Sequence, residues 1–284
     1  MAFDSIVEGM RITKLNHDYE FEKDIANGKG IIINQIDPYD KKGQKNFNGL
    51  QSSFFGSDFS DEIQYRERWS CKCHKLTGKG YAGMICDACH TPVEFTTVDL
   101  EKFGYIKINH FKILTPLATM KLHDILGKSS GEYVLDKILN VRYNEASDRV
   151  ISEREEKEYR KHPFFHKGMR FFTKHFQEIM LYYMHLKPNK AKAIQELLDT
   201  PQCTFTHYVV VPSSAVRPES PGVKDKKFYS LRINQILKSI IRTSNNINDL
   251  GDPKEMSSYN LVAVDRFLSS LQRDINSYKD EIYK

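Results

Sequence analysis

The sequence has little cysteine outside one short segment, no long apolar run and no strong excess of charge. Of its 284 residues five are cysteine, and four of these fall between positions 71 and 89. No stretch approaches the roughly 20 apolar residues of a membrane helix, and the N-terminus lacks the basic flank and apolar core of a signal peptide. The net charge of +5 is too small to indicate a nucleic-acid partner by itself. These absences argue against a membrane-bound or disulfide-rich secreted protein and favour a reducing, cytoplasmic location.

The four clustered cysteines form two close pairs, Cys71 with Cys73 and Cys86 with Cys89, separated by a basic loop that contains glycine. Two such pairs can converge on one tetrahedral Zn²⁺, with Zn–S distances of about 2.3 Å. The alternatives are two disulfides, which would be strained within pairs this close, or four unrelated thiols. Because four protein ligands fill the shell, the pattern predicts one structural zinc ion and no open catalytic position. The fifth cysteine, Cys203, is expected to be an ordinary thiol.

Periodic patterns predict an α+β fold that is mainly helical. Alternating and β-branched residues predict strands at 104–109 and 208–211. Helical spacing predicts a helix, a turn and a second helix over 116–143, and a helical segment over 163–199. The apolar face of that last segment is formed by Phe172, Phe176, Ile179, Met180 and Tyr183.

Two long helical patterns follow, at 231–247 and 259–283, with a strong stop signal between them at 248–253. An apolar stripe on each and a short connection predict an antiparallel hairpin. The polar residues beside each stripe favour a hairpin that projects as a coiled coil. The alternative is a pair of helices buried in a core.

Taken together, these segments resemble the N-terminal clamp region of the largest subunit of multisubunit DNA-directed RNA polymerase, called β′ in bacteria. In that family a Cys-x-Cys run and a basic loop precede Gly-x-Ile-Cys-x-x-Cys, and here residues 71–75 read CKCHK and residues 83–94 read GMICDACHTPVE. Shorter similarities are FNGL at 47–50, FG at 55–56 and FGYI at 103–106. His74 and His90 stand where the family has glycine, so histidine must hold these turns. An imidazole at either position is chemically able to bind zinc, but the two cysteine pairs already supply the four ligands.

A second similarity lies at 209–218, which reads VVVPSSAVRP and resembles the family's entry into its lid loop. The predicted hairpin falls where the family carries its clamp helices. The resemblance therefore implies five segments: an N-terminal clamp segment (1–68), a zinc ribbon (69–95), a clamp body (96–211), a lid-like loop (212–229) and a clamp-helix coiled coil (230–284).

The resemblance implies a mobile jaw that closes over DNA and the RNA–DNA hybrid, together with a β-like subunit and the remaining portion of β′. Cations of the ribbon and the lid-like loop are expected to contact phosphates without reading sequence, and the alternative for any one of them is a solvated surface. These cations are Arg66, Arg68, Lys72, Lys75, Lys79, Arg217, Lys224, Lys226 and Lys227. A promoter-specificity factor of σ type is expected to dock on the outer face of the hairpin, at Lys238, Arg242, Asn245, Asn246 and Asp249.

The family's catalytic motif, whose three aspartates hold Mg²⁺, has no counterpart here, because the sequence contains no Asp-x-Asp-x-Asp run. We therefore expect no catalytic residue in this chain, Mg²⁺ only in a partner catalytic chain, and no nucleotidyltransferase activity by the chain alone. The divergence from the family is typical of a viral or phage polymerase acting in the cytoplasm of its host, with no membrane partner. The alternatives are a free-standing zinc-ribbon transcription regulator that binds DNA or a host polymerase, and an unrelated zinc-ribbon DNA-binding protein.

Overall fold

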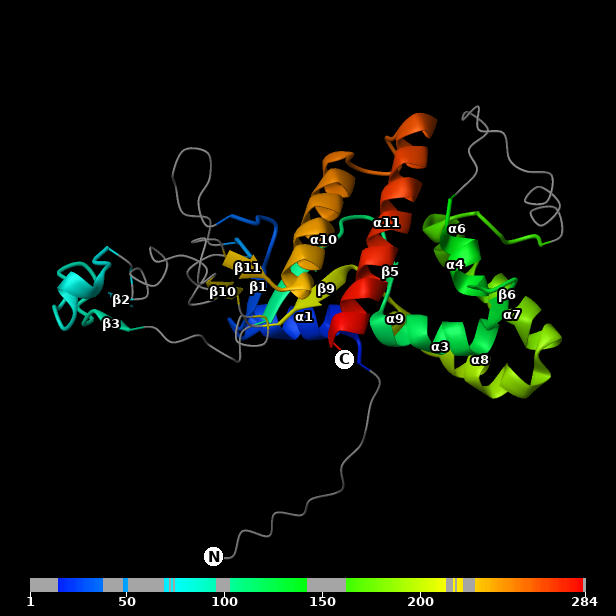
Figure 1. Ribbon diagram of the computed structural model, residues 1–284, viewed down its shortest axis with the longest axis horizontal. Helices are drawn as coiled ribbons and strands as arrows, with labels where there is room; N and C mark the ends of the chain where they lie inside the picture. Colours follow the sequence, from blue (N-terminus) through cyan, green and yellow to red (C-terminus); the bar gives the residue numbers. More distant parts are fainter. Residues whose placement is uncertain are drawn as a thin grey trace, which may run out of the picture.

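The computed structural model describes residues 15–37, 48–50, 69–71, 73, 75–95, 103–141, 162–212, 217, 219–221 and 228–282. Two long helices, α10 (Arg232–Asp249) and α11 (Ser258–Ile282), lie side by side near its centre (Figure 1). An ion pair of 3.6 Å joins Arg232 at the start of α10 to Glu281 at the end of α11. The predicted antiparallel hairpin and the mixed α+β class are therefore confirmed.

A three-stranded sheet packs against α10, in the order β1 (Gly30–Ile32), β4 (Phe103–Lys107) and β9 (Tyr208–Val211). Strand β1 is parallel to β4, and β9 is antiparallel to it, with Gly104 opposite Val211. Strands β4 and β9 are the two strands that the alternating pattern predicted.

Helix α1 (His17–Ala26) covers this sheet through aromatic contacts. The ring of Phe21 stacks on Tyr208 with 3.9 Å between centroids, and the hydroxyl of Tyr105 donates to Asp24 at 2.5 Å. Burial and the neighbouring carboxylate raise the pKa of Tyr105. The N-terminal helix is thus bound to strands that lie about 80 and 190 residues further along the chain.

The predicted helix–turn–helix is also observed. Helix α3 (Pro116–Leu126) begins at Thr115, whose hydroxyl accepts from the backbone N–H of Ala118, and proline occupies its first position, where no N–H is needed. The helix ends at Gly127, where φ is 68°. The turn is a small β-hairpin that leads to the second helix; these elements are β6 (Lys128–Ser129), β7 (Glu132–Tyr133) and α4 (Val134–Leu139).

The helical segment predicted over 163–199 divides into α6 (Met169–Lys174), α7 (Phe176–Leu186) and α8 (Ala191–Leu198). All five residues of its predicted apolar face are buried in the main core, which confirms that prediction. The short elements beside them are η2 (Pro188–Lys190), α9 (Pro201–Thr204), β5 (Ile113–Leu114) and β8 (Phe205–Thr206), the last two paired with each other.

The segment predicted as a lid-like loop contains secondary structure. Strands β10 (Glu219–Pro221) and β11 (Phe228–Ser230) pair antiparallel, with Glu219 opposite Ser230. The end of this small hairpin leads directly into α10, so it sets where the long helix begins.

The hairpin of α10 and α11 is embedded in the body of the protein, which contradicts the predicted projection. Both apolar stripes belong to the main core. Polar side chains beside the stripes bond to strand ends: Asn248 donates to Lys107 O at 2.9 Å and Gln272 accepts from the Leu114 N–H at 2.9 Å. Because Asn248 lies in the last turn of α10, that end of the helix is bound to the end of β4 and does not extend away from the sheet. The alternative given by the sequence analysis, a pair of helices buried in a core, therefore describes α10 and α11 better than the projecting coiled coil.

Arg217 is a buried connector and not a surface cation. Its side chain is 2% exposed, and its guanidinium donates to Pro212 O at 3.0 Å, to Asn234 Oδ1 at 3.2 Å and to Leu50 O at 3.2 Å. Asn234 in turn donates to the Arg217 carbonyl at 3.0 Å. This burial contradicts the prediction that Arg217 contacts phosphate, because a planar group with five donors is here used to join three separate backbone segments.

We predict that Arg217→Met lowers the free energy of unfolding by about 3–5 kcal/mol, because buried acceptors lose charged donors that a thioether does not replace. Urea titration followed by circular dichroism measures this. The matched control is Arg242→Met, at an exposed position of α10, which should change stability by less than about 0.5 kcal/mol. Equal effects of the two substitutions would contradict the connecting role.

Candidate metal centre

Short strands bring the two cysteine pairs together. Strand β2 (Trp69–Ser70) pairs antiparallel with β3 (Glu94–Phe95) and ends immediately before Cys71. The chain then turns back through a bridge between Ser70 and Thr77 and the short helix η1 (Lys79–Tyr81). A second bridge, between Ile85 and Pro92, closes the turn that carries Cys86 and Cys89. Both pairs therefore lie at turns of one small ribbon.

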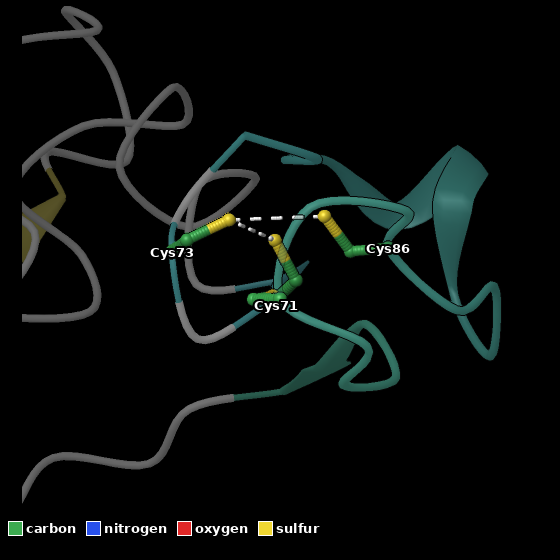
Figure 2. Close-up of side chains that lie close together, drawn as sticks. Cys71, Cys73 and Cys86 are labelled. Carbon is green, nitrogen blue, oxygen red and sulfur yellow. Dashed lines mark hydrogen bonds between the residues drawn. The ribbon is translucent and has the colours of Figure 1, made fainter.

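The four sulfurs converge on one point. All four Sγ atoms lie within 4.8 Å of one another, and the Cys73 sulfur is 3.6 Å from Cys71 and 3.7 Å from Cys86. Figure 2 shows these three side chains directed toward each other. A tetrahedral ion with bonds of about 2.3 Å places its sulfurs about 3.8 Å apart. A disulfide would need about 2.05 Å, and all the cysteines are free. The spacing therefore suits one tetrahedral metal ion.

Neighbouring donors favour thiolates at two of the positions. The Leu76 N–H lies 3.4 Å from the Cys71 sulfur. The Thr91 hydroxyl lies 3.0 Å from the Cys89 sulfur, and this bond lowers the pKa of Cys89 to about 5. The Lys75 N–H lowers the pKa of Cys73, but the Cys89 sulfur, desolvation and the other thiols outweigh it and raise that pKa to about 12. Four thiolates this close repel one another unless a cation neutralises them, so the cluster is suited to a divalent metal.

Left-handed backbone makes the second turn possible. His90 has φ 53° and donates its N–H to Cys86 O at 2.8 Å, while Gly83 has φ 79° and donates to Val93 O at 2.9 Å. The expectation that a histidine holds a turn where the family has glycine is therefore confirmed for His90. Among the residues that the structure describes, the cluster of candidate ligands consists of the four cysteines. His74 lies outside the described residues.

The ribbon has a core too small to be stable alone. Its described apolar cluster consists of the buried residues Cys71, Cys86 and Val93, against which Trp69 and Leu76 pack. Domains with so little apolar burial are usually held by a metal or a disulfide. The single tryptophan of the chain, with its ring 5.4 Å from Phe95, is part of this cluster and can report on its integrity.

The predicted nucleic-acid contacts are only partly described. Lys75 and Lys79 are exposed on the ribbon, while Arg217 is buried as stated above. Six predicted residues lie outside the described part of the chain: Arg66, Arg68, Lys72, Lys224, Lys226 and Lys227. Beside Lys79 the ribbon also exposes three apolar side chains that sequence reasoning missed, Tyr81, Met84 and Ile85. Their signal in the sequence is weak, because single apolar residues in a loop are common.

The predicted docking residues divide between two environments. Arg242, Asn246 and Asp249 are exposed, and their spacing of four and three residues aligns them along one face of α10. Asn245 donates to Asn34 O at 2.8 Å and is half-buried. Lys238 is half-buried and has an interaction of its own. Three of the five residues therefore remain available to a partner.

No second cluster of metal ligands is present within the described residues. The cysteine group is the one set of three or more His, Cys, Asp or Glu side chains there that converges. Two-metal phosphoryl transfer requires carboxylates gathered on the ions, and the described residues do not provide that arrangement. None of the helices in this same part of the chain combines the length and apolar character needed to cross a membrane.

We predict that Cys86→Ser abolishes stoichiometric zinc binding and unfolds the ribbon, because metal binding in such sites is coupled to folding. Elemental analysis should give about one zinc per wild-type chain and almost none per variant. Emission from Trp69 should shift to the red in the variant and in wild type treated with a chelator. Cys203→Ser is the matched control and should retain zinc, because Cys203 lies outside the cluster. Full zinc occupancy in Cys86→Ser would contradict the site.

Comparison with known proteins adds no relative, since no protein-family model and no curated protein matches the chain. What the chain does must therefore be inferred from its own residues. Those that bear on it are the cysteine cluster, the exposed lysines of the ribbon and the exposed face of α10.

Proposed function

We propose that the chain is the non-catalytic N-terminal clamp portion of the largest subunit of a DNA-directed RNA polymerase, with one structural zinc ion. The observation that carries the proposal is the convergence of Cys71, Cys73, Cys86 and Cys89 on one tetrahedral site within a ribbon. It is supported by the pairing of β4 with β9 and by the contact between α10 and α11, since these elements lie in the segments that carry the resemblance.

In this role the ribbon contacts nucleic acid through charge. Lys75 and Lys79 are exposed on the ribbon, and lysines in such a position bind phosphates without reading bases. Such binding weakens steeply as salt rises. DNA and the RNA–DNA hybrid are therefore the proposed ligands of the clamp, in the cytoplasm of a host cell.

Catalysis belongs to partner chains. The described residues hold no carboxylate cluster for Mg²⁺, so the remaining portion of β′ and a β-like subunit would supply it. The exposed face formed by Arg242, Asn246 and Asp249 would dock a σ-like promoter-specificity factor. A cation, an amide and a carboxylate along one helix face suit a partner helix of complementary charge.

The test is affinity purification of the tagged chain from the cells in which it acts, followed by mass spectrometry. The proposal predicts a stoichiometric partner that carries the Asp-Phe-Asp-Gly-Asp motif, together with a smaller specificity factor. The charge swap Arg242→Glu with Asp249→Lys should retain the catalytic partner and lose the factor at least tenfold, because it inverts the docking face without changing net charge.

The control swap is Lys192→Glu on α8 with Asp199→Lys at the C-cap of that helix. These exposed positions have the same seven-residue spacing, and the variant should retain both partners. Recovery of a complete host polymerase, with its own full-length largest subunit, would instead identify a transcription regulator. Recovery of no polymerase chain would overturn the proposal.

A further inference from the structure

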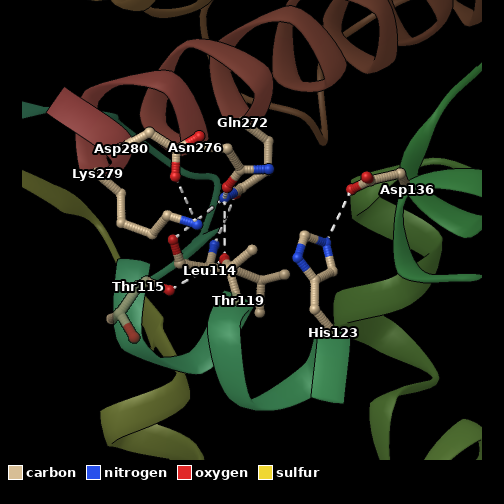
Figure 3. A network of polar contacts seen from close by, with 9 residues as sticks. All are labelled: Leu114, Thr115, Thr119, His123, Asp136, Gln272, Asn276, Lys279 and Asp280. Atoms are coloured by element: carbon tan, nitrogen blue, oxygen red, sulfur yellow. Dashed lines mark hydrogen bonds and ion pairs between the residues drawn. The ribbon is translucent and has the colours of Figure 1, made fainter. Parts of the chain in front are cut away.

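A polar groove of about 600 Å³ lies between α11 and the pair α3 and α4. Figure 3 shows its two walls, with Gln272, Asn276, Lys279 and Asp280 on α11 facing His123 and Asp136. The floor is secured by Gln272, which is buried and bonded to the backbone of Leu114. The groove is therefore built on a fixed part of the core.

Two arginines carry the unneutralised charge of this groove. Arg266 and Arg273 line it and are exposed. Within the described residues Arg266 has no ion pair, and the Arg273 guanidinium donates only to the Ser270 hydroxyl, at 3.4 Å. Asp280 lies 3.0 Å from Lys279, and Asp136 lies 3.1 Å from His123, which neutralises it only when protonated. With Lys279 the groove holds three cations against two carboxylates, and this net positive charge suits an anion.

The surroundings favour a polypeptide over a nucleic-acid strand. Single strands are held largely by bases that stack on open aromatic faces. The one aromatic side chain of the groove, Tyr133, has His123 stacked 4.0 Å away and the Lys128 ammonium 4.7 Å from its ring centroid. The ring of Tyr133 is therefore already engaged by two neighbouring side chains.

The spacing of the arginines defines the ligand further. Seven residues along a helix separate Arg266 from Arg273 by about 10 Å. In a polyproline II segment, residues i and i+3 lie on one face about 9 Å apart, whereas in a β-strand they point to opposite faces. Asn140, Asn276 and Ser270 line the groove between and opposite them, and such amide and hydroxyl groups can bond the backbone of an extended segment, whereas a helix satisfies its own backbone.

We propose that this groove binds an extended acidic segment of a partner protein, with carboxylates at positions i and i+3 that pair with Arg266 and Arg273. The inference does not depend on the polymerase assignment, because it concerns only the charge and geometry of the groove. It also assigns the partner a different face from the one on α10.

The probe is a fluorescent ten-residue peptide with glutamate at every third position, titrated with the full chain and followed by anisotropy. Wild type should bind it, bind the glutamine version at least tenfold more weakly, and lose affinity as salt rises. Arg266→Ala with Arg273→Ala should weaken binding at least tenfold, since two charge-assisted contacts are lost. Because both side chains are exposed, the melting temperature should not change.

The control variant is Lys112→Ala with Lys174→Ala, which removes the same charge from exposed positions elsewhere and should bind like wild type. Arg266→Glu with Arg273→Glu should prefer a lysine version of the peptide. Absence of binding to wild type, or equal loss in the control variant, would overturn the proposal. Tighter binding of a ten-nucleotide single strand through the same two arginines would overturn it as well and assign the groove to nucleic acid.

Discussion

Burial of the seam between α10 and α11 is the constraint on which the rest of the main body depends. The seam is apolar, but the side chains at its margins are polar and bond to backbone atoms of neighbouring strands, as Asn248 does at Lys107 and Gln272 at Leu114. A hydrogen bond from a helix side-chain amide defines the position of a strand more closely than an apolar contact does. If the strand moved, the bond would be lost and a buried polar group would be left unsatisfied. The sheet and the helices around α3 are therefore placed relative to one hairpin.

The ribbon follows a different physical principle. Its apolar cluster is small, so we expect its stability to come from a metal ion shared by the four sulfurs more than from area removed from water. The two parts should thus respond differently to chemical change. Removal of metal affects the ribbon, whereas loss of Arg217 affects the junction of β9, Leu50 and α10.

Periodicity and ligand spacing predicted much of this arrangement. The strands β4 and β9, the face that includes Phe172 and Tyr183, and the convergence of the cysteines all follow from local patterns. The embedding of the hairpin could not be predicted from local patterns. Polar residues beside an apolar stripe have the same sequence pattern whether they contact water or the end of a strand. The burial of Arg217 could not be predicted either, because the chemical type of a side chain does not determine its exposure.

The groove beside α11 could not be predicted from the sequence for a related reason. Arg266 and Arg273 become neighbours of His123 and Asp136 only after folding brings together positions about 140 residues apart. Sequence patterns identify one helix face at a time, and a site made by three helices needs their relative placement. The proposed docking residues Arg242, Asn246 and Asp249 differ in this respect, because they lie on a single helix and their shared face follows from their spacing.

The most direct test of the central claim is extension of a labelled RNA on a preformed RNA–DNA scaffold with Mg²⁺. The clamp assignment predicts no nucleotide incorporation by the purified chain, none by the catalytic partner alone, and templated synthesis when the two are combined. Synthesis by this chain in a preparation free of other chains would contradict the assignment, and so would full activity of the partner without it.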